Sequence, residues 1–526
     1  MRLLSFFWSQ EKQGSDRKEG AGGEWGASLR EWGCLAWRGM EGRGGERAGR
    51  WVAFAVGVAI ALRAWEALES SLWLDELHTL SHASLPTLGA VIEHVRAEVV
   101  HQPLFFGVVH CFGGWEEGAA LRFLPALSSL LLFLPVIAFA RAAGLGARGV
   151  ALAAWLLACL PYQVHYATEL RPYAWLAVFS AGAMWAAFSE HGSRIGRLAL
   201  FAACVAAGVL THRIMEVVVV SIGAARLLVR SREMVPLAWL VGAGALAVAP
   251  EVPWLLAYVQ QATNDRLEYH ADSGGFVLRR ALVLEALALP TRLFAPCLGA
   301  LGGGWALLAK LGAAVFFLVV GGGLVAAWRG RASATPLGAP VRALGLAALC
   351  CFTIVFALSV YRWDRLPLQY FAPVAWALPV AVAVLAERWP ERSRAQFAGL
   401  VALSALALGI AQAGGRNMED MRGAVAAARE LGSTRGEALY TGLMVQPSLF
   451  SHTLAYDAYG RELPRVEPDS VPRRGEPGFE RPVVLLRRGR IPLTDARWAR
   501  LREGRSIATE RKIDDYIAVF VLEPAP

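Results

Sequence analysis

The sequence predicts an all-α polytopic membrane protein of about eleven transmembrane helices, with helices along its outer surface and a small C-terminal α/β domain. Hydrophobic residues make up 56% of the 526 positions and charged residues only 18%, whereas a soluble chain is about a quarter charged. The apolar residues come in blocks of about 17–25 positions, the length that crosses a bilayer as a helix. A backbone inside lipid must pair its amides internally, so these blocks are helical.

The N-terminal segment, residues 1–50, is rich in Gly, Arg and Glu and lacks periodicity, so we expect it to be disordered and cytoplasmic. It has no apolar core before a cleavage site, unlike a signal peptide, and both Met1 and Met40 are candidate starts. The net charge of +9 does not indicate nucleic acid, because the arginines punctuate the apolar blocks, which is a topology signal. The seven cysteines show no CxxC spacing and mostly lie in apolar runs, which argues against a disulfide or zinc framework.

Eleven spans follow from the apolar blocks, and arginine clusters mark alternate connections between them. By the positive-inside bias the arginine-bearing side is cytoplasmic, so the N-terminus lies inside and the C-terminal tail outside the cell (inner) membrane. The predicted spans are 51–68, 122–141, 149–164, 173–189, 197–211, 214–230, 235–257, 303–328, 341–360, 367–387 and 395–414.

Residues 103–113 are apolar but too short to span a bilayer. Counting them as a span would place Arg141 and Arg148 outside and invert the rest of the topology. We therefore interpret 86–98 and 103–113 as helices lying along the outer membrane surface.

The predicted outer face gathers all but one of the ten histidines and most acidic residues beyond the N-terminal segment. A purely structural bundle has no reason to collect titratable groups on one face, whereas an outward-facing active site does. The tail, residues 415–526, replaces long apolar blocks with an amphipathic helix pattern at 418–432 and three short strand patterns, which predicts an extracytoplasmic α/β domain.

Two adjacent carboxylates, Asp75 and Glu76, follow the first span at the outer interface. A carboxylate here can serve as general base toward an acceptor hydroxyl or amine, and the alternative is a solvated helix N-terminus. Arg122 opens the second span, where it either binds phosphate through its planar guanidinium or extends toward lipid headgroups. His101 enters the second surface helix beside Gln102 and a proline, a pattern that is also ordinary for a helix start.

The connection from Tyr166 to Tyr173 carries Glu169 and Arg171 between two spans. The two charges cannot both face lipid, so we expect them to pair with each other or with a phosphorylated ligand. His78 and His82 have the i, i+4 spacing that presents two ligands to one metal, but interfacial histidine is common and no second pair reinforces them.

These motifs, in this order, resemble the GT-C superfamily of membrane glycosyltransferases, in the branch of dolichyl-phosphate-mannose–protein mannosyltransferases and the bacterial aminoarabinose transferase. That family has an Asp-Glu pair after the first span, a His-Pro-Pro surface helix, an Ala-Leu-Arg motif, a Tyr-Ser-x-Glu-x-Arg-x-Tyr connection and a later Thr-His. The matching residues are Asp75-Glu76, His101-Gln102-Pro103, Ala120-Leu121-Arg122, Tyr166 to Tyr173, and Thr211-His212. Two departures are Gln102 in place of a proline and Gln369-Tyr370 in place of Arg-Tyr, where Arg362 or Arg365 supplies the missing charge.

The resemblance implies a transmembrane catalytic domain over 51–414 that transfers a sugar from a polyprenyl-phosphate donor to an envelope acceptor, which is a lipid, glycan or protein. Asp75 would be the base, with Glu76 beside it, and His101 and His212 would line the pocket. The implied donor-phosphate residues are Arg122, Glu169, Arg171, Tyr173, Arg365 and Tyr370. The resemblance implies no certain cofactor and a possible divalent metal ion. The alternative function is a transporter of a lipid-linked sugar or other envelope precursor. A transporter predicts inverted repeats and broken helices.

Overall fold

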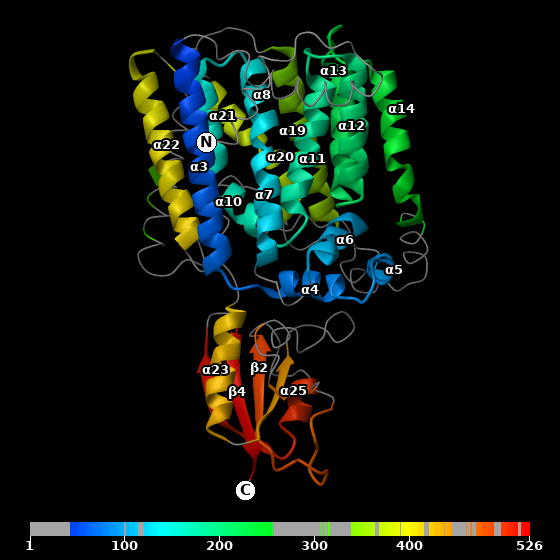
Figure 1. The fold of residues 1–526 in the computed structure, drawn as a ribbon, viewed down its shortest axis with the longest axis vertical. Helices are drawn as coiled ribbons and strands as arrows, with labels where there is room; N and C mark the ends of the chain where they lie inside the picture. The colour runs from blue at the N-terminus through cyan, green and yellow to red at the C-terminus, as the bar shows by residue number, and fades with distance from the viewer. Residues whose placement is uncertain are drawn as a thin grey trace, which may run out of the picture.

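The computed structural model is a helical bundle with a smaller sheet-containing tail at one end (Figure 1). The structure describes residues 43–98, 101–113, 120–254, 256, 307, 311, 314–315, 338–362, 368–389, 391–414, 420–435, 437–443, 459, 463–464, 466, 470–488, 496–513 and 517–525.

The helices of the bundle alternate in direction, as expected of chains that cross a bilayer repeatedly. Their bounds are α3 Arg43–Glu69, α7 Phe123–Leu131, α8 Phe133–Ala142, α9 Ala147–Cys159, α10 Pro161–Thr168, α11 Tyr173–Phe188, α12 Arg194–Val209, α13 Ile214–Leu228, α14 Leu237–Val248, α19 Ala339–Arg362, α20 Ala372–Ala375, α21 Ala377–Glu387 and α22 Glu391–Gly414. Short 3₁₀ turns are η4 Ala120–Arg122, η5 Ala249–Glu251 and η6 Leu368–Phe371.

Five helices of the described chain are long and apolar enough to cross a membrane, or up to seven if each of two bent pairs counts as one span. The chain is thus a multi-pass membrane protein. The bent pairs are α9 with α10, at 52°, and residues 369–375 with α21, at 46°. The expected span at 303–328 lies outside the described residues, and α11, α12 and α13 are shorter than a full span, so the total of eleven stays a prediction.

Three short helices lie across the tail-side end of the bundle: α4 Leu74–Ala83, α5 Leu88–Glu98 and α6 Pro103–Phe112 (Figure 1). The last two occupy the places expected for surface helices. Pro103 starts α6 where its missing N–H costs nothing, and the N–H of Leu104 donates to the carbonyl of Leu210 at 2.9 Å. This bond fixes α6 against the connection that carries His212.

The tail forms a four-stranded sheet with the order β1-β2-β4-β3, in which only the β1–β2 pair is parallel. The elements are α23 Met421–Ser433, β1 Leu439–Leu443, β2 Val483–Arg488, α25 Ala496–Leu501, β3 Arg505–Lys512 and β4 Ile517–Pro524. Helix α23 begins at Asp420, whose side chain accepts from the N–H of Gly423, and its apolar face packs on β2 and β4. The helix and three of the strands match the sequence patterns, whereas β3 was not expected.

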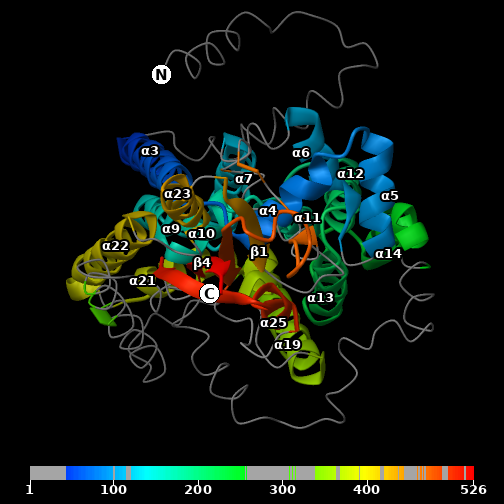
Figure 2. The same ribbon diagram turned by 90° about the horizontal axis from the view of Figure 1, so that it is seen from below.

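The tail contacts the bundle through the loop between α3 and α4. The N–H of Leu72 donates to the Tyr459 hydroxyl at 2.7 Å, and the N–H of Arg422 donates to the Ser71 hydroxyl at 2.9 Å. Seen from the tail side, the sheet and α23 lie over the ends of the bundle helices rather than beside them (Figure 2). The tail therefore reaches the loop that leads directly to Asp75.

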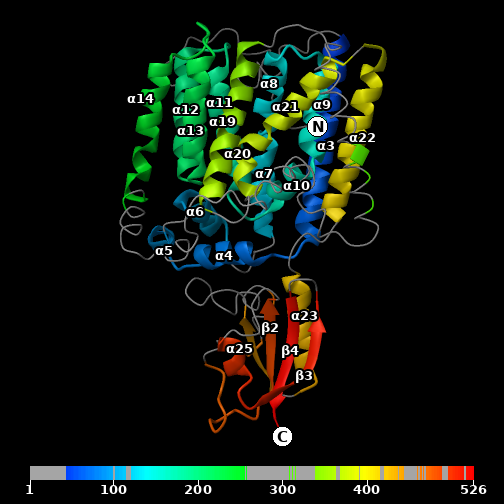
Figure 3. The same ribbon diagram turned by 180° about the vertical axis from the view of Figure 1, so that it is seen from behind.

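Behind this loop, α3, α9 and α22 pack against one another (Figure 3). Gly409 of α22 is buried at the contact, where an added Cβ would lie 2.4 Å from the carbonyl oxygen of Cys159. The absence of a side chain at Gly409 thus allows α22 to approach the place where α9 ends.

Candidate functional site

The first turn of α4 presents Asp75 and Glu76 in different directions, as successive helical residues do. Carboxylates are favoured there because the amide dipoles point positive charge at a helix N-terminus. Glu76 also accepts from the backbone N–H of Trp73 at 3.1 Å, which closes the start of the helix.

Glu76 is fully buried and bound on all sides. Its Oε1 accepts from Nε of Arg122 at 2.7 Å and from the N–H of Leu170 at 2.8 Å, and its Oε2 accepts from Nη2 of Arg122. Arg122 further donates to the carbonyls of Ser70 and Ser71 at 2.6 and 2.8 Å. This pair therefore ties the α3–α4 loop, the start of α7 and the α10–α11 connection to one point.

Asp75 lies in a different environment, with 36% of its side chain exposed. Nη2 of Arg171 stands 4.0 Å from its Oδ2, while Nη1 donates to the Asp75 carbonyl and the Thr79 hydroxyl at 3.3 Å each. Arg171 is 7% exposed, and its Nε has no hydrogen-bond acceptor within the described part of the chain. An exposed carboxylate thus stands beside a buried cation that retains a free donor.

A row of aromatic rings lies beyond Asp75 and Arg171, from the α10–α11 connection to Tyr370. Ring centroids of Tyr166 and Tyr173 are 5.6 Å apart, those of Tyr173 and His212 are 5.9 Å apart, and those of His212 and Tyr370 are 5.5 Å apart. Burial, together with the nearby Arg171 and Arg213, lowers the pKa of His212 to about 3. His212 is consequently a neutral hydrogen-bonding group here and not a cation.

Glu169 lies between these two environments, immediately after α10. It is 5% exposed, and its Oε2 has no hydrogen-bond partner among the described residues. Burial raises the pKa of Glu169 to about 7, and the Glu76 and Asp75 carboxylates act in the same direction against the opposing effects of His165 and Arg171. Glu169 therefore changes its charge near neutral pH.

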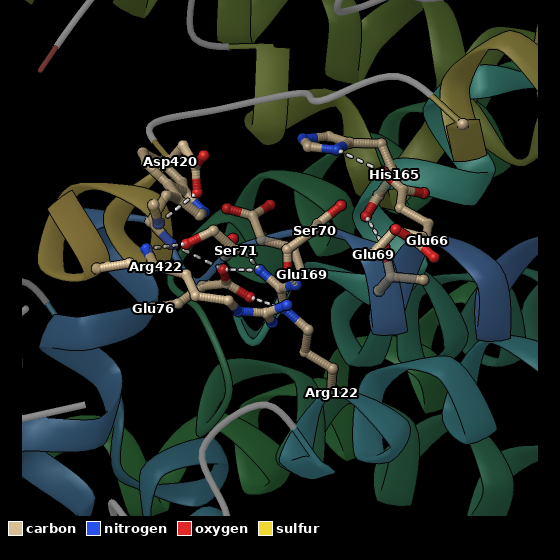
Figure 4. A pocket seen from close by; sticks show the side chains of 15 residues that line it. Glu66, Glu69, Ser70, Ser71, Glu76, Arg122, His165, Glu169, Asp420 and Arg422 are labelled. Carbon is tan, nitrogen blue, oxygen red and sulfur yellow. Dashed lines mark hydrogen bonds and ion pairs between the residues drawn. The ribbon is translucent and has the colours of Figure 1, made fainter. Parts of the chain in front are cut away.

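A cavity of about 380 Å³ opens where α3, α4, α10 and α23 meet (Figure 4). Glu76 and Arg122 form part of its wall, Glu169 and His165 come from α10 and its end, and Asp420 and Arg422 come from the tail. The other lining residues are Glu66, Glu69, Ser70, Ser71, Trp73, Thr168, Gly414, Gly423 and Ala426. The tail is thus part of the cavity wall.

Most of the expected site residues fall into two groups. Asp75, Arg171, Tyr173, His212 and Tyr370 form one group, and Glu76, Arg122 and Glu169 line the cavity. His101 belongs to neither, because its ring lies 5.3 Å from that of His78 and 5.2 Å from that of Phe106. Arg365 lies outside the described residues.

The unusual Gln102 has a structural partner. It is 1% exposed, and its Nε2 donates to Oε1 of Glu251 at 3.2 Å. Glu251 also lies 3.9 Å from Nε of Arg213. Gln102 thereby connects the first outer loop to the end of α14.

His78 and His82 lie one turn apart on α4, with their rings side by side. Their ring centroids are 3.9 Å apart, and Nδ1 of His82 lies 2.9 Å from the His78 carbonyl oxygen. Within the described ranges, no group of three or more His, Cys, Asp or Glu side chains is arranged to hold a metal ion. A divalent metal ion held by these two histidines stays a prediction.

Sequence reasoning did not identify three buried polar residues, Arg63, Glu66 and Gln412, of which Glu66 lines the cavity. Oε1 of Glu66 accepts from Nε2 of Gln412 at 2.9 Å and lies 3.3 Å from Nδ1 of His165. The available signal was a lone Arg and a lone Glu three positions apart inside an otherwise apolar span, because ionisable groups at such places usually serve a function.

The fold is similar to that of the solved protein ArnT. ArnT from Cupriavidus metallidurans in the apo state matches with a TM-score of 0.53 and 16% identity, covering 90% of this chain and 98% of that chain. The same protein bound to undecaprenyl phosphate matches with a TM-score of 0.51 and 14% identity over the same shares. At these identities the likeness concerns the fold alone.

A further likeness, to the oligosaccharyltransferase AglB from Archaeoglobus fulgidus, has a TM-score of 0.44 and 13% identity, covering 83% of this chain and 69% of that one. This score is too low to argue a common fold. No family model matches the chain, and no curated protein matches it in sequence.

Proposed function

We propose that the chain is a glycosyltransferase that moves a sugar from a polyprenyl-phosphate donor to an envelope acceptor at the outer face of the membrane. The observation that carries this proposal is the exposed carboxylate of Asp75 beside buried Arg171, whose Nε has no acceptor within the described chain. The fold supports it, since ArnT has been solved bound to undecaprenyl phosphate.

In this mechanism an acceptor hydroxyl or amine attacks the anomeric carbon of the donor sugar. Asp75 takes the acceptor proton as the new bond to carbon forms. The bond between the anomeric carbon and the phosphate oxygen breaks, and its electron pair remains on the lipid phosphate. Arg171 stabilises that negative charge, with Tyr173 beside it and neutral His212 and Tyr370 completing the wall.

Arg122 takes a different role in this proposal from the one that the family motif implies. Its guanidinium already donates to Glu76 and to two loop carbonyls, so binding a phosphate would break those bonds. We assign Arg122 and Glu76 to holding the loop that precedes Asp75. The acceptor would approach through the cavity between the bundle and the tail, where Glu169 has a free oxygen.

The test begins with binding of undecaprenyl phosphate to the purified protein, followed by transfer from undecaprenyl-phosphate sugars. Arg171→Ala should weaken binding by roughly 2–5 kcal/mol, the cost of removing one partner from a partly dry charge pair. The control is Arg230→Ala, an exposed arginine remote from the site in the chain. Equal affinity of the two variants would remove Arg171 from the phosphate site, and absence of binding by the unaltered protein would end the proposal.

One observation favours the alternative of a transporter: two spans are bent, at 52° and 46°, and broken helices are characteristic of transport sites. A transporter would move a lipid-linked sugar across the bilayer of a vesicle without cleaving it. Reconstituted protein that translocates the donor but releases no free lipid phosphate would establish this function instead.

A further inference from the structure

The break between α9 and α10 leaves backbone carbonyls without their usual helical donors. Leu160 is extended, with ψ at 131°, and the next residue is Pro161, which has no N–H to offer the carbonyl of Leu157. The two halves meet at 52°. An unpaired carbonyl in a bilayer is costly, so a broken span needs donors from elsewhere.

Arg63 of α3 supplies those donors. Its Nη2 donates to the carbonyls of Leu157 and Gln163 at 3.3 and 3.5 Å, and its Nη1 donates to that of Ala158 at 3.3 Å. Its Nε donates to the Ser129 hydroxyl of α7 at 2.9 Å. The side chain is 2% exposed, so one planar guanidinium joins both sides of the break to α3 and α7.

Glu66, one turn further along α3, contacts the last turn of α10. Its Oε1 lies 3.3 Å from Nδ1 of His165 and accepts from Gln412 of α22. Helix α3 therefore holds α10 at its first turn through Arg63 and near its end through Glu66. The residues that follow α10 are Glu169, which lines the cavity, and Arg171, which reaches Asp75.

We infer that Arg63 is a positioning residue for this site: it fixes the broken span at the angle that delivers Glu169 and Arg171 to Asp75. The assignment of a phosphate-binding role to Arg171 rests on the proposed function, whereas the placement of α10 by Arg63 does not. The bend between α9 and α10 explains the buried Arg63, because the freed carbonyls need donors. The bend in turn places Glu169 and Arg171 near Asp75.

The experiment compares Arg63→Met with Arg226→Met in the full-length protein. Arg226 is a matched control, because it is also buried and donates to two backbone carbonyls, those of Val229 and Val235 at 2.7 and 3.0 Å. Both variants should lose thermal stability. Only Arg63→Met should speed hydrogen exchange in residues 161–171, and only it should weaken binding of undecaprenyl phosphate, by about ten- to a hundredfold per folded protein.

Arg63→Lys keeps a donor and the charge, so it should recover part of both effects, and it carries the test if Arg63→Met does not fold. Unchanged exchange over 161–171 in Arg63→Met would overturn the inference, as would equal acceleration in Arg226→Met. If the unaltered protein does not bind undecaprenyl phosphate, the proposed function fails, and the exchange measurement alone decides the role of Arg63.

Discussion

Asp75 and Glu76 are neighbours in the chain with opposite surroundings, one partly exposed beside Arg171 and the other buried against Arg122. If Asp75 is the base, Asp75→Asn keeps its shape but accepts no proton, and turnover should fall by about two to four powers of ten. Binding of undecaprenyl phosphate and thermal stability should stay close to those of the unaltered protein.

Glu76→Gln serves as the companion variant, because it leaves buried Arg122 without a charge partner. We expect it to lower the free energy of unfolding by about 3–5 kcal/mol, while the folded fraction retains more turnover than Asp75→Asn. The measurements are transfer from an undecaprenyl-phosphate sugar, normalised to folded protein, and thermal unfolding. Full turnover by Asp75→Asn would exclude it as the base.

Glu169 provides a prediction about pH. Its pKa is raised from 4.5 to about 7 by burial, so the folded state holds the proton more tightly than the unfolded state. The resulting stability is present in full below about pH 4.5 and is lost as the pH rises through 7. Glu169→Gln removes this dependence, which amounts to about 3 kcal/mol at most.

Thermal unfolding of the unaltered protein and of Glu169→Gln between pH 4.5 and 8 checks this pH dependence. Glu69→Gln is the control, because Glu69 lines the same cavity but is exposed. The unaltered protein and the control should lose stability in parallel, while Glu169→Gln should show a flatter profile. Identical slopes for all three would mean that Glu169 is not buried as described.

Among the elements, the contact of α22 with the end of α9 gives a prediction that depends on one missing side chain. In Gly409→Ala the new Cβ would lie 2.4 Å from the Cys159 carbonyl oxygen, and backbone cannot move aside as a side chain can. We expect a loss of about 1–3 kcal/mol in stability. Gly399→Ala, on the same helix with open space around it, should be neutral or stabilising; equal stability of both variants would contradict the close approach.

The elements also show where sequence reasoning succeeds and where it stops. Helix α23 and three tail strands follow from local apolar periodicity, which the pattern of residues records directly. Strand β3 was missed because its sequence, RSIATERK, is largely polar and exposed at the edge of the sheet. Its assignment depends on pairing with β4, which no local pattern encodes.

The same limit applies to the site. The motifs identified Asp75, Arg122, Glu169 and Arg171, but not that Arg122 is bound to Glu76. The carbonyls of α9 and α10 that Arg63 binds lie 94 to 100 positions away in the chain, and a backbone carbonyl is the same whatever the residue, so the sequence does not reveal it. Contacts of this kind can be found only once the folded structure is known.

At the scale of the whole molecule, the arrangement predicts a topology. The helices alternate from the tail-side end, so the start of α12, which carries Arg194 and Arg197, and the connection between α13 and α14 lie at the opposite end of the bundle (Figure 1). There Arg194 donates to the Arg232 carbonyl at 2.7 Å, and Arg197 to that of Glu233 at 2.8 Å. Reporter fusions at Arg194 and at the C-terminus should report cytoplasm and exterior respectively; a cytoplasmic C-terminus would contradict the outward-facing site.

The tail's share in the cavity wall has a consequence for how the protein is made. Asp420 and Arg422 line the cavity at the start of α23, and α23 packs on β2 and on β4, which is synthesised long after the bundle. A nascent chain whose helices are already inserted would thus display Glu76, Arg122 and Glu169 beside an unfinished cavity wall. Folding of the tail would be the event that completes the cavity, and partly synthesised or truncated copies would lack part of its wall.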